Sequence, residues 1–469
     1  MIDWTAQRLA RAAGARLQDE GRRGTGAGPA RVVIDSREVR DGDLFIGLPG
    51  SREDGGAHIS AALEAGAWGV LAGERHTSAL EEPSPGAVLV HPDPLAALQS
   101  LARAWRAQLS QAGAQVIAVT GSSGKTSTKD ILAALASTQK RTFASPENFN
   151  TEIGLPLAIL AAPAGTEVLV LEMAMRGAGQ IAQLTEIAKP QVGVIVNVGP
   201  VHLELLGSLQ AIAAAKAELI AGMAPGATIV LPAHEPLLDP HRRSDLKLIT
   251  FGEGGDVSLN GQAPDGSIAI RHSEDPITLR PSFSQSHNLL NLLAAVAAVR
   301  ALSITPAGEL NVNFSALRGE RIALDKGVLL INDCYNANPI SMRAALEDLV
   351  AVAPGRRVAV LGDMLELGEQ SAGFHLQIAG YAAALGVELL VSVGALSAGM
   401  RAGFHGEFHS AKDAAAAAVL LDGLLRAGDT VLLKGSRGVG LELIAERLAG
   451  SRSPAGDSLV GSHATGGHG

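Results

Sequence analysis

Short apolar runs alternate with stretches of helical periodicity along most of the chain, and they form three groups. In residues 1–112 the runs "RVVID", "DLFIGL", "WGVLAG" and "AVLVH" precede an amphipathic stretch, "PDPLAALQSLARAWRAQL". Residues 113–314 hold "QVIAVT", "EVLVLEM", "VGVIVNVG" and "ATIVLP", and residues 315–450 hold "GVLLIND", "RVAVLGD", "LLVSVG" and "TVLLKG". Strands that alternate with helices at this spacing predict an α/β protein of three domains, with parallel sheets and crossover helices.

Composition and charge narrow the class of protein. The length of 469 residues suits about three domains, and the formal net charge of −9 argues against nucleic acid or an anionic membrane as a partner. A single cysteine, Cys334, excludes a disulfide framework or a multi-cysteine zinc site and fits a reducing compartment. No signal peptide and no apolar run long enough for a bilayer are found, so we expect a cytoplasmic protein without a membrane span. Residues 451–469, rich in Gly, Ser and His, predict a disordered tail.

The stretch "QVIAVTGSSGKTSTKDILAALAS" has a strand, a glycine-rich loop and a helix in the order that a phosphate-binding loop requires. Its glycines let the backbone approach phosphate, and the helix start points amides at it. We expect Lys125 to reach the β- and γ-phosphates of ATP and the Thr126 hydroxyl to reach Mg²⁺. Val119 stands where the common pattern has a glycine, so an ordinary βα turn is the alternative. The predicted nucleotide-binding residues here are Thr120, Gly121, Ser122, Ser123, Gly124, Lys125, Thr126 and Ser127.

Three further residues are candidates for a metal or catalytic site. Glu172 ends an apolar strand, which is where a metal ligand beside a phosphate loop belongs, although it could also cap a helix. His202 follows another strand end, close after Asn197, and a lone histidine is more often structural. Lys216 lies among alanines in a helical stretch, and its spacing alone indicates an exposed lysine.

These motifs stand in an order that resembles the Mur ligase family over nearly the whole chain up to the tail. The order is "DSREVRDGDLFIGLPG", "TGSSGKTSTK", "NFNTEIGLPL", "LEMAMRG", "NVGPVHLELLGS", "AAKAEL", "HNLLNLLAA", "LRGERI", "DCYNANPISM", "LGDMLELGE" and "LLKGSRG". "NFNTEIGLPL", "DCYNANPISMRAAL" and "LLKGSRG" are similar to the family members that add D-alanyl-D-alanine to UDP-N-acetylmuramoyl-tripeptide. The resemblance implies an N-terminal UDP-substrate domain, a central P-loop-type ATPase domain with a parallel sheet, and a C-terminal Rossmann-like ligase domain.

The resemblance also implies roles for polar residues in all three domains. Each has a plainer alternative: Arg37 in a surface salt bridge, Asn288 as a helix cap, and the 148–151 segment as a turn. Asn288 or Asn291 would contact adenine, Arg321 would reach the ATP phosphates when the third domain closes, and Asp333 would hold the ribose. The residues expected to bind the UDP-linked substrate or the dipeptide are Ser36, Arg37, Asn148, Asn150, Thr151, Tyr335, Asn336, Asn338, Lys434, Ser436 and Arg437.

The reaction implied is an ATP-dependent ligation in peptidoglycan precursor synthesis. ATP would bind with two Mg²⁺ ions, and a peptide carboxylate would become an acyl phosphate before the amine of D-alanyl-D-alanine attacks it. The implied catalytic residues are Lys125, His202, Lys216 and Arg321. The implied metal ligands are Thr126, Glu172, His202 and Lys216, the last as a carbamate. The resemblance suggests a monomer, and both diaminopimelate and lysine fit as the third peptide residue.

Three alternatives stay open at this point. A ligase for another acid and amine, such as a folylpolyglutamate synthase-like enzyme, would not need the "DSR" and "DCYNANP" segments. A P-loop switch or motor would bind partners in a nucleotide-dependent way and would form no acceptor-dependent product. A non-catalytic homologue is disfavoured by the intact Lys125, Thr126 and Glu172.

Overall fold

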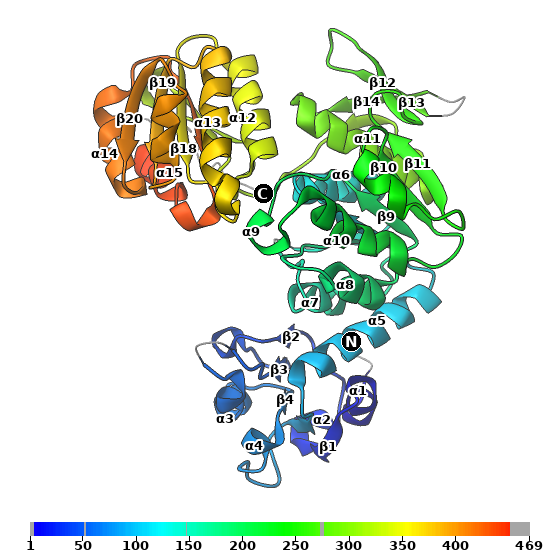
Figure 1. Cartoon of the computed structure of the whole chain (residues 1–469). Coiled ribbons are helices and arrows are strands. Elements are labelled where there is room, and N and C mark those ends of the chain that lie inside the picture. Colours follow the sequence, from blue (N-terminus) through cyan, green and yellow to red (C-terminus); the bar gives the residue numbers. More distant parts are fainter. Residues whose placement is uncertain (1–3, 51–52, 147, 273–275, 451–469) are drawn as a thin grey trace, which may run out of the picture. The chain divides into compact units, whose positions relative to one another are not determined.

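The computed structural model describes residues 4–50, 53–146, 148–272 and 276–450, so the predicted disordered tail lies outside the described residues (Figure 1). The chain divides into two compact units. The first reaches to Ser315 and includes Glu366–Gly368, and the second begins at Ala316 and holds the rest of the described chain. The α/β fold class predicted from the alternating pattern is confirmed, because parallel sheets with crossover helices are present in both units.

The first unit opens with a sheet of five described strands, in the order β1-β5-β4-β3-β2. Its parallel strands are the four apolar runs expected between residues 1 and 112, and β1 is added antiparallel to β5. The strands are β1 Arg16–Asp19, β2 Val32–Val33, β3 Leu44–Ile46, β4 Gly69–Ala72 and β5 Ala87–Val90. The helices are α1 Ala6–Ala13, α2 Gly21–Gly24, α3 Ile59–Glu64, α4 Glu74–Thr77 and α5 Pro94–Gln111.

Helix α5 links this sheet to the rest of the first unit. Asp93 caps its start, since the side chain accepts from the amides of Leu95 and Ala96, and Pro94 follows at the first helical position. The indole of Trp105 donates to the backbone oxygen of Ala162 (3.0 Å). The helix therefore packs against α7 of the central region through a buried aromatic side chain with a satisfied polar group.

The second sheet of the first unit has ten described strands in the order β15-β14-β13-β12-β11-β10-β9-β6-β8-β7. Strands β7 to β11 pair in parallel, whereas β12, β13 and β14 form an antiparallel extension. The strands are β6 Gln115–Thr120, β7 Thr142–Ala144, β8 Val168–Glu172, β9 Val192–Ile195, β10 Thr228–Pro232, β11 Lys247–Phe251, β12 Val257–Gln262, β13 Ile268–His272, β14 Ile277–Pro281 and β15 Gly308–Leu310.

The helices around this sheet build the core that supports the predicted phosphate loop. They are α6 Lys125–Ser137, α7 Gly154–Ala161, α8 Gln180–Ala188, α9 Leu203–Leu206, α10 Leu209–Gly222 and α11 Ser286–Ala301. Helix α11 is buried almost all round from Leu292 to Val299, which agrees with its lack of a polar face. Its small alanines let it pack closely against α6, the helix that follows the loop (Figure 1).

The second unit is a single sheet of six described strands in the order β16-β17-β21-β18-β19-β20. All pairs are parallel except β16 with β17. The elements are β16 Glu320–Ala323, β17 Leu329–Asn332, α12 Pro339–Val352, β18 Arg357–Gly362, α13 Ser371–Ala384, β19 Leu389–Val393, β20 Glu407–Ala411, α14 Ala414–Leu424, β21 Thr430–Lys434 and α15 Glu442–Gly450. Because the strands run parallel, the loops after β17, β18 and β21 meet at one edge. None of the helices in the described chain combines the length and apolar composition needed to cross a bilayer.

Candidate active site

The phosphate-loop segment forms the tight strand-to-helix turn that its sequence predicts. Strand β6 ends at Thr120, and α6 begins at Lys125. Gly124 is the N-cap residue of α6, with φ 77°, and no side chain forms a capping hydrogen bond there. A Cβ atom on Gly124 would lie 2.7 Å from Oδ1 of Asn291, so neither the backbone angle nor the space suits a larger residue. The cap residue thus brings no side chain to the start of α6, and a helix start of this kind attracts a phosphate.

A side chain from the neighbouring strand holds the loop in shape. Oδ1 of Asn197, just after β9, accepts from the amides of Ser122 (3.1 Å) and Ser123 (2.9 Å), and Nδ2 donates to the Ser123 oxygen (3.2 Å). The Ser122 hydroxyl donates to the oxygen of Gly199 (3.0 Å) and accepts from its amide (2.8 Å). The Lys125 ammonium reaches back to the oxygen of Gly121 (2.9 Å) and so lies beside the loop.

Glu172 lies at the end of β8, and both of its carboxylate oxygens are held. The Thr126 hydroxyl donates to Oε2 (2.7 Å) and the Asn150 amide donates to Oε1 (2.8 Å). The residue is 2% exposed. The predicted neighbours Thr126 and Glu172 are thus in direct contact, and Asn150, expected at the substrate, lies in this cluster. The Thr151 hydroxyl accepts from the amide of Gly154 (3.3 Å), the first residue of α7.

Lys216 is buried in α10 at 2% exposure, which corrects the expectation from spacing alone of an exposed lysine. The alanines around it pack against the unit and carry the lysine inward with them, so an alanine-rich face did not mean a solvent face. Burial, and then the charge of Lys125, hold the pKa of the Lys216 ammonium well below its ordinary value. Within the described residues no carboxylate forms an ion pair with it.

His202 stands at the start of α9 in a left-handed backbone conformation, at φ 53°. Burial is the main cause that lowers the pKa of its imidazole, and the charges of Lys125 and Lys216 lower it further. Its Nδ1 is paired with the carboxylate of Glu366, and this pairing raises the pKa of the imidazole. Glu366 belongs to the first unit. A carboxylate on one ring nitrogen is the usual arrangement for orienting an imidazole whose other nitrogen binds a metal.

Asn291 of α11 lies against Gly124 of the loop, and Asn288 lies beside Asn291. Nδ2 of Asn291 donates to Oδ1 of Asn288 (3.2 Å), and both residues are buried. The cap of α11 is Gln285, so the alternative in which Asn288 caps this helix is wrong. The reason is that the helix begins one residue before His287, which moves Asn288 into the first turn and onto the α6 face.

In the first sheet, the predicted UDP-binding arginine forms a local ion pair. Nε and Nη2 of Arg37 donate to the Asp35 carboxylate, at 2.9 Å from Oδ1 and 2.5 Å from Oδ2. Those hydrogen bonds lower the pKa of Asp35 to about 2. Ser36 lies between the two residues in a short 3₁₀ turn. The Arg37 side chain is 87% exposed, so the guanidinium remains accessible to a ligand.

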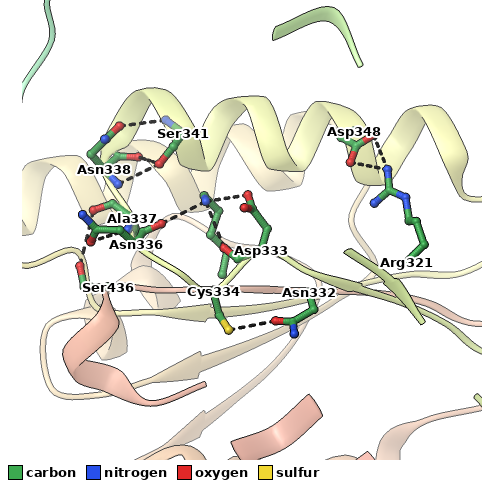
Figure 2. Close-up of polar contacts among 11 residues, drawn as sticks. Arg321, Asn332, Asp333, Cys334, Asn336, Ala337, Asn338, Ser341, Asp348 and Ser436 are labelled. Atoms are coloured by element: carbon green, nitrogen blue, oxygen red, sulfur yellow. Dashed lines mark hydrogen bonds and ion pairs between the residues drawn. The ribbon is translucent and has the colours of Figure 1, made fainter. Parts of the chain in front are cut away.

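The polar loops of the second unit meet at the carboxyl edge of its sheet, as Figure 2 shows. The Lys434 ammonium, at the end of β21, donates to Oδ2 of Asp333 at 2.7 Å. Asn338 caps α12 in a capping box with Ser341. Farther along α12 lies Asp348, and both of its carboxylate oxygens accept from Nη2 of Arg321 on β16, at 2.7 and 2.6 Å (Figure 2).

Sequence comparison identifies both regions. Residues 119–299 match the Mur ligase middle domain, and residues 317–437 match the domain described as "Mur ligase, glutamate ligase domain". The UDP-N-acetylmuramoyl-tripeptide–D-alanyl-D-alanine ligase of Bacillus subtilis is 36% identical over 432 residues, which are 89% of this chain and 92% of that protein. Its counterpart in Mycobacterium leprae is 34% identical and covers 96% and 99%. The chain belongs to the Mur ligase family.

Solved structures agree with this assignment. MurF from Acinetobacter baumannii matches with a TM-score of 0.82 at 28% identity, over 96% of this chain and 99% of that one. MurF from Thermotoga maritima, solved in complex with ADP, matches with a TM-score of 0.77 at 31% identity, over 90% and 97%. The family predicted from the ordered motifs is therefore confirmed, and the folylpolyglutamate synthase-like and P-loop motor alternatives are not favoured.

For a Mur ligase, the residues around Glu172 suit a magnesium site. Mg²⁺ takes oxygen ligands and usually keeps several waters. Glu172 and the Thr126 hydroxyl supply adjacent oxygens, 2.7 Å apart, within the first unit. No group of three or more His, Cys, Asp and Glu side chains that could hold a metal ion is found among the described residues, so Glu172 and Thr126 supply only part of such a site.

Asn197 and Arg318 are two residues of this Mur ligase that our sequence reasoning did not single out for a role. Asn197 braces the phosphate loop, and its position directly after a strand beside that loop was the available signal. Arg318 lies in the same "LRGERI" segment as Arg321, with its guanidinium carbon 4.1 Å from the ring centroid of Tyr335. Arg318 and Arg321 are three residues apart, and this spacing does not predict which of them forms an ion pair with a carboxylate.

Proposed function

We propose that the chain joins D-alanyl-D-alanine to UDP-N-acetylmuramoyl-tripeptide at the expense of ATP, in peptidoglycan precursor synthesis. The terminal carboxylate of the tripeptide attacks the γ-phosphorus of ATP, and ADP leaves. The amine of the dipeptide then attacks the acyl phosphate carbon, inorganic phosphate leaves from the tetrahedral intermediate, and the new amide loses one proton. The observation that carries this proposal is the match to D-alanyl-D-alanine-adding ligases over almost their full length.

The phosphate loop supplies the charge stabilisation that the first step needs. The amides at the start of α6, where the cap residue Gly124 offers no side chain, and the Lys125 ammonium would contact the β- and γ-phosphates. Thr126 and Glu172 would hold one Mg²⁺, which would supply positive charge to offset that of the ATP phosphates. In this assignment Asn150 orients the Glu172 carboxylate. The buried Asn288 and Asn291 would contact adenine from the opposite side of the loop.

Lys216 and His202 are proposed as ligands of a second Mg²⁺. A lysine whose pKa is lowered by burial is partly a neutral amine, and a neutral amine adds to CO₂ to form a carbamate with release of one proton. The carbamate would replace a buried cation with an anion close to Lys125. Incubation with ¹³C-bicarbonate should give a carbamate carbon signal that disappears in a Lys216→Met variant. If wild type and variant give the same spectrum, the modification is not at Lys216.

The second unit would bind the remaining parts of the substrates. Asp333 is proposed to hold the ribose, and Tyr335, Asn336 and Arg437 to face the peptide or dipeptide. Of the two arginines in "LRGERI", Arg321 is held by Asp348 through Nη2 alone, and its Nη1 has no hydrogen-bond partner among the described residues. Arg318 makes no ion pair among the described residues, so we propose that Arg318 shares the phosphate role assigned to Arg321. An acyl phosphate hydrolyses in water, so closure of the second unit over the loop is part of this proposal.

The decisive experiment is phosphate release from ATP with Mg²⁺ and UDP-N-acetylmuramoyl-tripeptide, with and without D-alanyl-D-alanine. We expect release to require both substrates and the product to have the mass of a UDP-linked pentapeptide. Release that ignores the dipeptide would indicate an ATPase or a ligase for another amine. The assay should use tripeptides ending in diaminopimelate and in lysine, because both fit. Size-exclusion chromatography of the same sample tests the proposed monomer, and the UDP and ATP substrates imply action in the cytoplasm.

A further inference from the structure

The Lys434 ammonium has no donor left for a ligand. Its Nζ donates to Oδ2 of Asp333 (2.7 Å), to the backbone oxygen of Asp333 (3.2 Å) and to the backbone oxygen of Asn336 (3.1 Å). A lysine ammonium has three N–H donors, so all three are used. The side chain is 3% exposed. A ligand carboxylate that bound here would have to displace one of these partners inside a closed site.

Ser436 is likewise occupied by the protein itself. Its hydroxyl accepts from the amide of Leu365 (3.0 Å) and lies 3.5 Å from the oxygen of Ala337, while its own amide donates to the oxygen of Asp363 (3.0 Å). One buried serine thus joins the loops after β17, β18 and β21. Figure 2 shows its contact with the loop after β17. Together, Lys434 and Ser436 fasten the 333–337 loop from beneath.

The accessible positive charge of this segment is that of Arg437. Arg437 follows Ser436 directly, is exposed, and places its guanidinium carbon 5.6 Å from the ring centroid of Tyr335. No carboxylate of the described chain forms an ion pair with Arg437. Tyr335 belongs to the loop that Lys434 and Ser436 hold, so the ring that supports Arg437 is placed by those two buried residues.

We propose that Lys434 and Ser436 are positioning residues, and that Arg437, resting on Tyr335, binds the carboxylate of the incoming dipeptide. This assignment rests on the proposed function. It divides the "KGSRG" segment by chemistry. An ammonium whose three donors are all used and a buried hydroxyl that accepts from Leu365 build the frame, and a guanidinium, whose forked donors match a carboxylate, makes the contact.

The test compares D-alanyl-D-alanine with D-alanyl-D-alaninamide, which lacks the carboxylate charge. For wild type we expect kcat/KM to be at least about tenfold higher for the acid, the value of one charge-assisted contact. Arg437→Met should reduce this ratio to near one. Lys434→Met should lower kcat/KM for both amines by a similar factor and keep the ratio. Lys434→Arg should fail as Lys434→Met does, because a guanidinium cannot reproduce three bonds from one nitrogen.

Two results would overturn the assignment: a ratio near one in Lys434→Met, or an unchanged ratio in Arg437→Met. Ser436→Ala, a smaller change, provides a readout that needs no substrate. Hydrogen exchange of the Leu365 amide should become at least about tenfold faster in this variant than in wild type, and unchanged exchange would refute the positioning role of Ser436. If the wild-type enzyme formed no product with D-alanyl-D-alanine, the proposed function would be refuted. The exchange experiment would still decide whether Ser436 positions the loop after β18.

Discussion

Lys125 and Lys216 carry the same charge in water, but the fold gives them different surroundings. Lys125 lies beside an open helix start, where its charge is useful to an incoming phosphate. Lys216 is enclosed, and the nearby charge of Lys125 adds to the cost of keeping it protonated. The first lysine is therefore suited to electrostatic stabilisation and the second to covalent modification as a neutral amine.

Replacing Lys125 with alanine should abolish turnover and leave the UDP-linked substrate bound. The reason is that the ammonium acts on ATP phosphates, while the proposed UDP site is in the first sheet. We expect kcat to fall by at least about a thousandfold, in the range of a lost transition-state donor. Coupled phosphate release measures kcat, and isothermal titration measures affinity for UDP-N-acetylmuramoyl-tripeptide. A variant that keeps more than about a tenth of the wild-type rate would contradict the role.

Asn197→Ala should weaken ATP binding without touching the nucleotide directly. It removes an acceptor for the amides of Ser122 and Ser123 and a donor to the Ser123 oxygen, so the loop loses its fixed shape. We expect the KM for ATP to rise about tenfold or more, which corresponds to the loss of one to two net hydrogen bonds. Asn197→Asp is the matched variant: it keeps the acceptors, adds a negative charge near the phosphates and should be worse. An ATP KM within twofold of wild type in both variants would exclude this role.

At this scale the sequence could indicate residues but not their partners. Lys125, Thr126 and Glu172 were found because each stands at the end of a strand or the start of a helix, positions that pattern fixes. The burial of Lys216 and the saturation of Lys434 depend on atoms that come from distant segments. No local spacing encodes that three acceptors from residues 333 and 336 converge on one ammonium a hundred residues later.

At the scale of elements, the turn between β6 and α6 depends on how closely α11 approaches it. Gly124→Ala should lower the free energy of unfolding, because it combines a left-handed backbone angle, worth about 1–2 kcal/mol, with a contact 2.7 Å from Asn291. Gly179→Ala is the matched control, since Gly179 also caps a helix at positive φ (84°) but has nothing within 4 Å. Urea unfolding of both variants should show a larger loss for Gly124→Ala. Equal losses would mean that α11 moves aside at no cost.

The loop after β18 should respond to pH through His375, which is fully buried in α13. Its Nε2 accepts from the amide of Met364 (2.9 Å) and its Nδ1 donates to the oxygen of Ser371 (2.8 Å), so the ring is neutral. Burial lowers the pKa of His375, although Ser371 and the Asp363 carboxylate oppose this. Protonation therefore favours the unfolded state: the stabilisation is complete above about pH 6.5 and is lost as the pH falls below it.

His375→Gln removes this titration while keeping an acceptor. Urea midpoints measured from pH 7.5 to 5 should fall more steeply with acidity for wild type than for the variant. Other histidines titrate equally in both proteins, so the difference in slope reports His375. Parallel slopes would show that the ring exchanges its proton without disturbing Met364.

Elements with strong patterns were predictable, and those that depend on tertiary context were not. The buried parallel strands of both units are continuous apolar runs, which is why their positions were predicted. Strands β12 to β14 have fewer buried residues than those strands and are not among the apolar runs that predicted strands; they form by pairing with one another. Strand β16 lies at the edge of its sheet and gains its conformation from β17.

At the scale of the whole molecule, the chain passes from one unit to the other between Ser315 and Ala316. The last residue of the first unit is held by α6: Oδ2 of Asp130 accepts from the amide (2.9 Å) and the hydroxyl (3.0 Å) of Ser315. Because α6 starts at the phosphate loop, the same rigid helix carries the predicted catalytic lysine and the anchor of the linker. The domain boundary near 315 follows from the restart of the strand pattern, whereas this anchor could not be predicted, since 185 residues separate its two partners.

Releasing that anchor should separate ATP binding from catalysis. In the described chain the Asp130 side chain contacts neither the loop nor Lys125, so in Asp130→Ala the KM for ATP should stay within about twofold. The change also removes the ion pair of Asp130 with Lys129 (3.2 Å), whose ammonium keeps its bond to the oxygen of Ser145. Without Asp130 the linker has more conformations, and productive closure of the second unit becomes rarer, so kcat should fall roughly five- to tenfold, as for the loss of about 1–1.4 kcal/mol of orientation. Ser315→Ala removes only the hydroxyl contact and should have a smaller effect in the same direction. Limited proteolysis, with cleavage sites mapped by mass, should show faster cutting near residue 316 in Asp130→Ala than in wild type. If kcat falls while the linker is cut no faster, the loss arises elsewhere in α6, and a rise in the KM for ATP would place it at the phosphate loop.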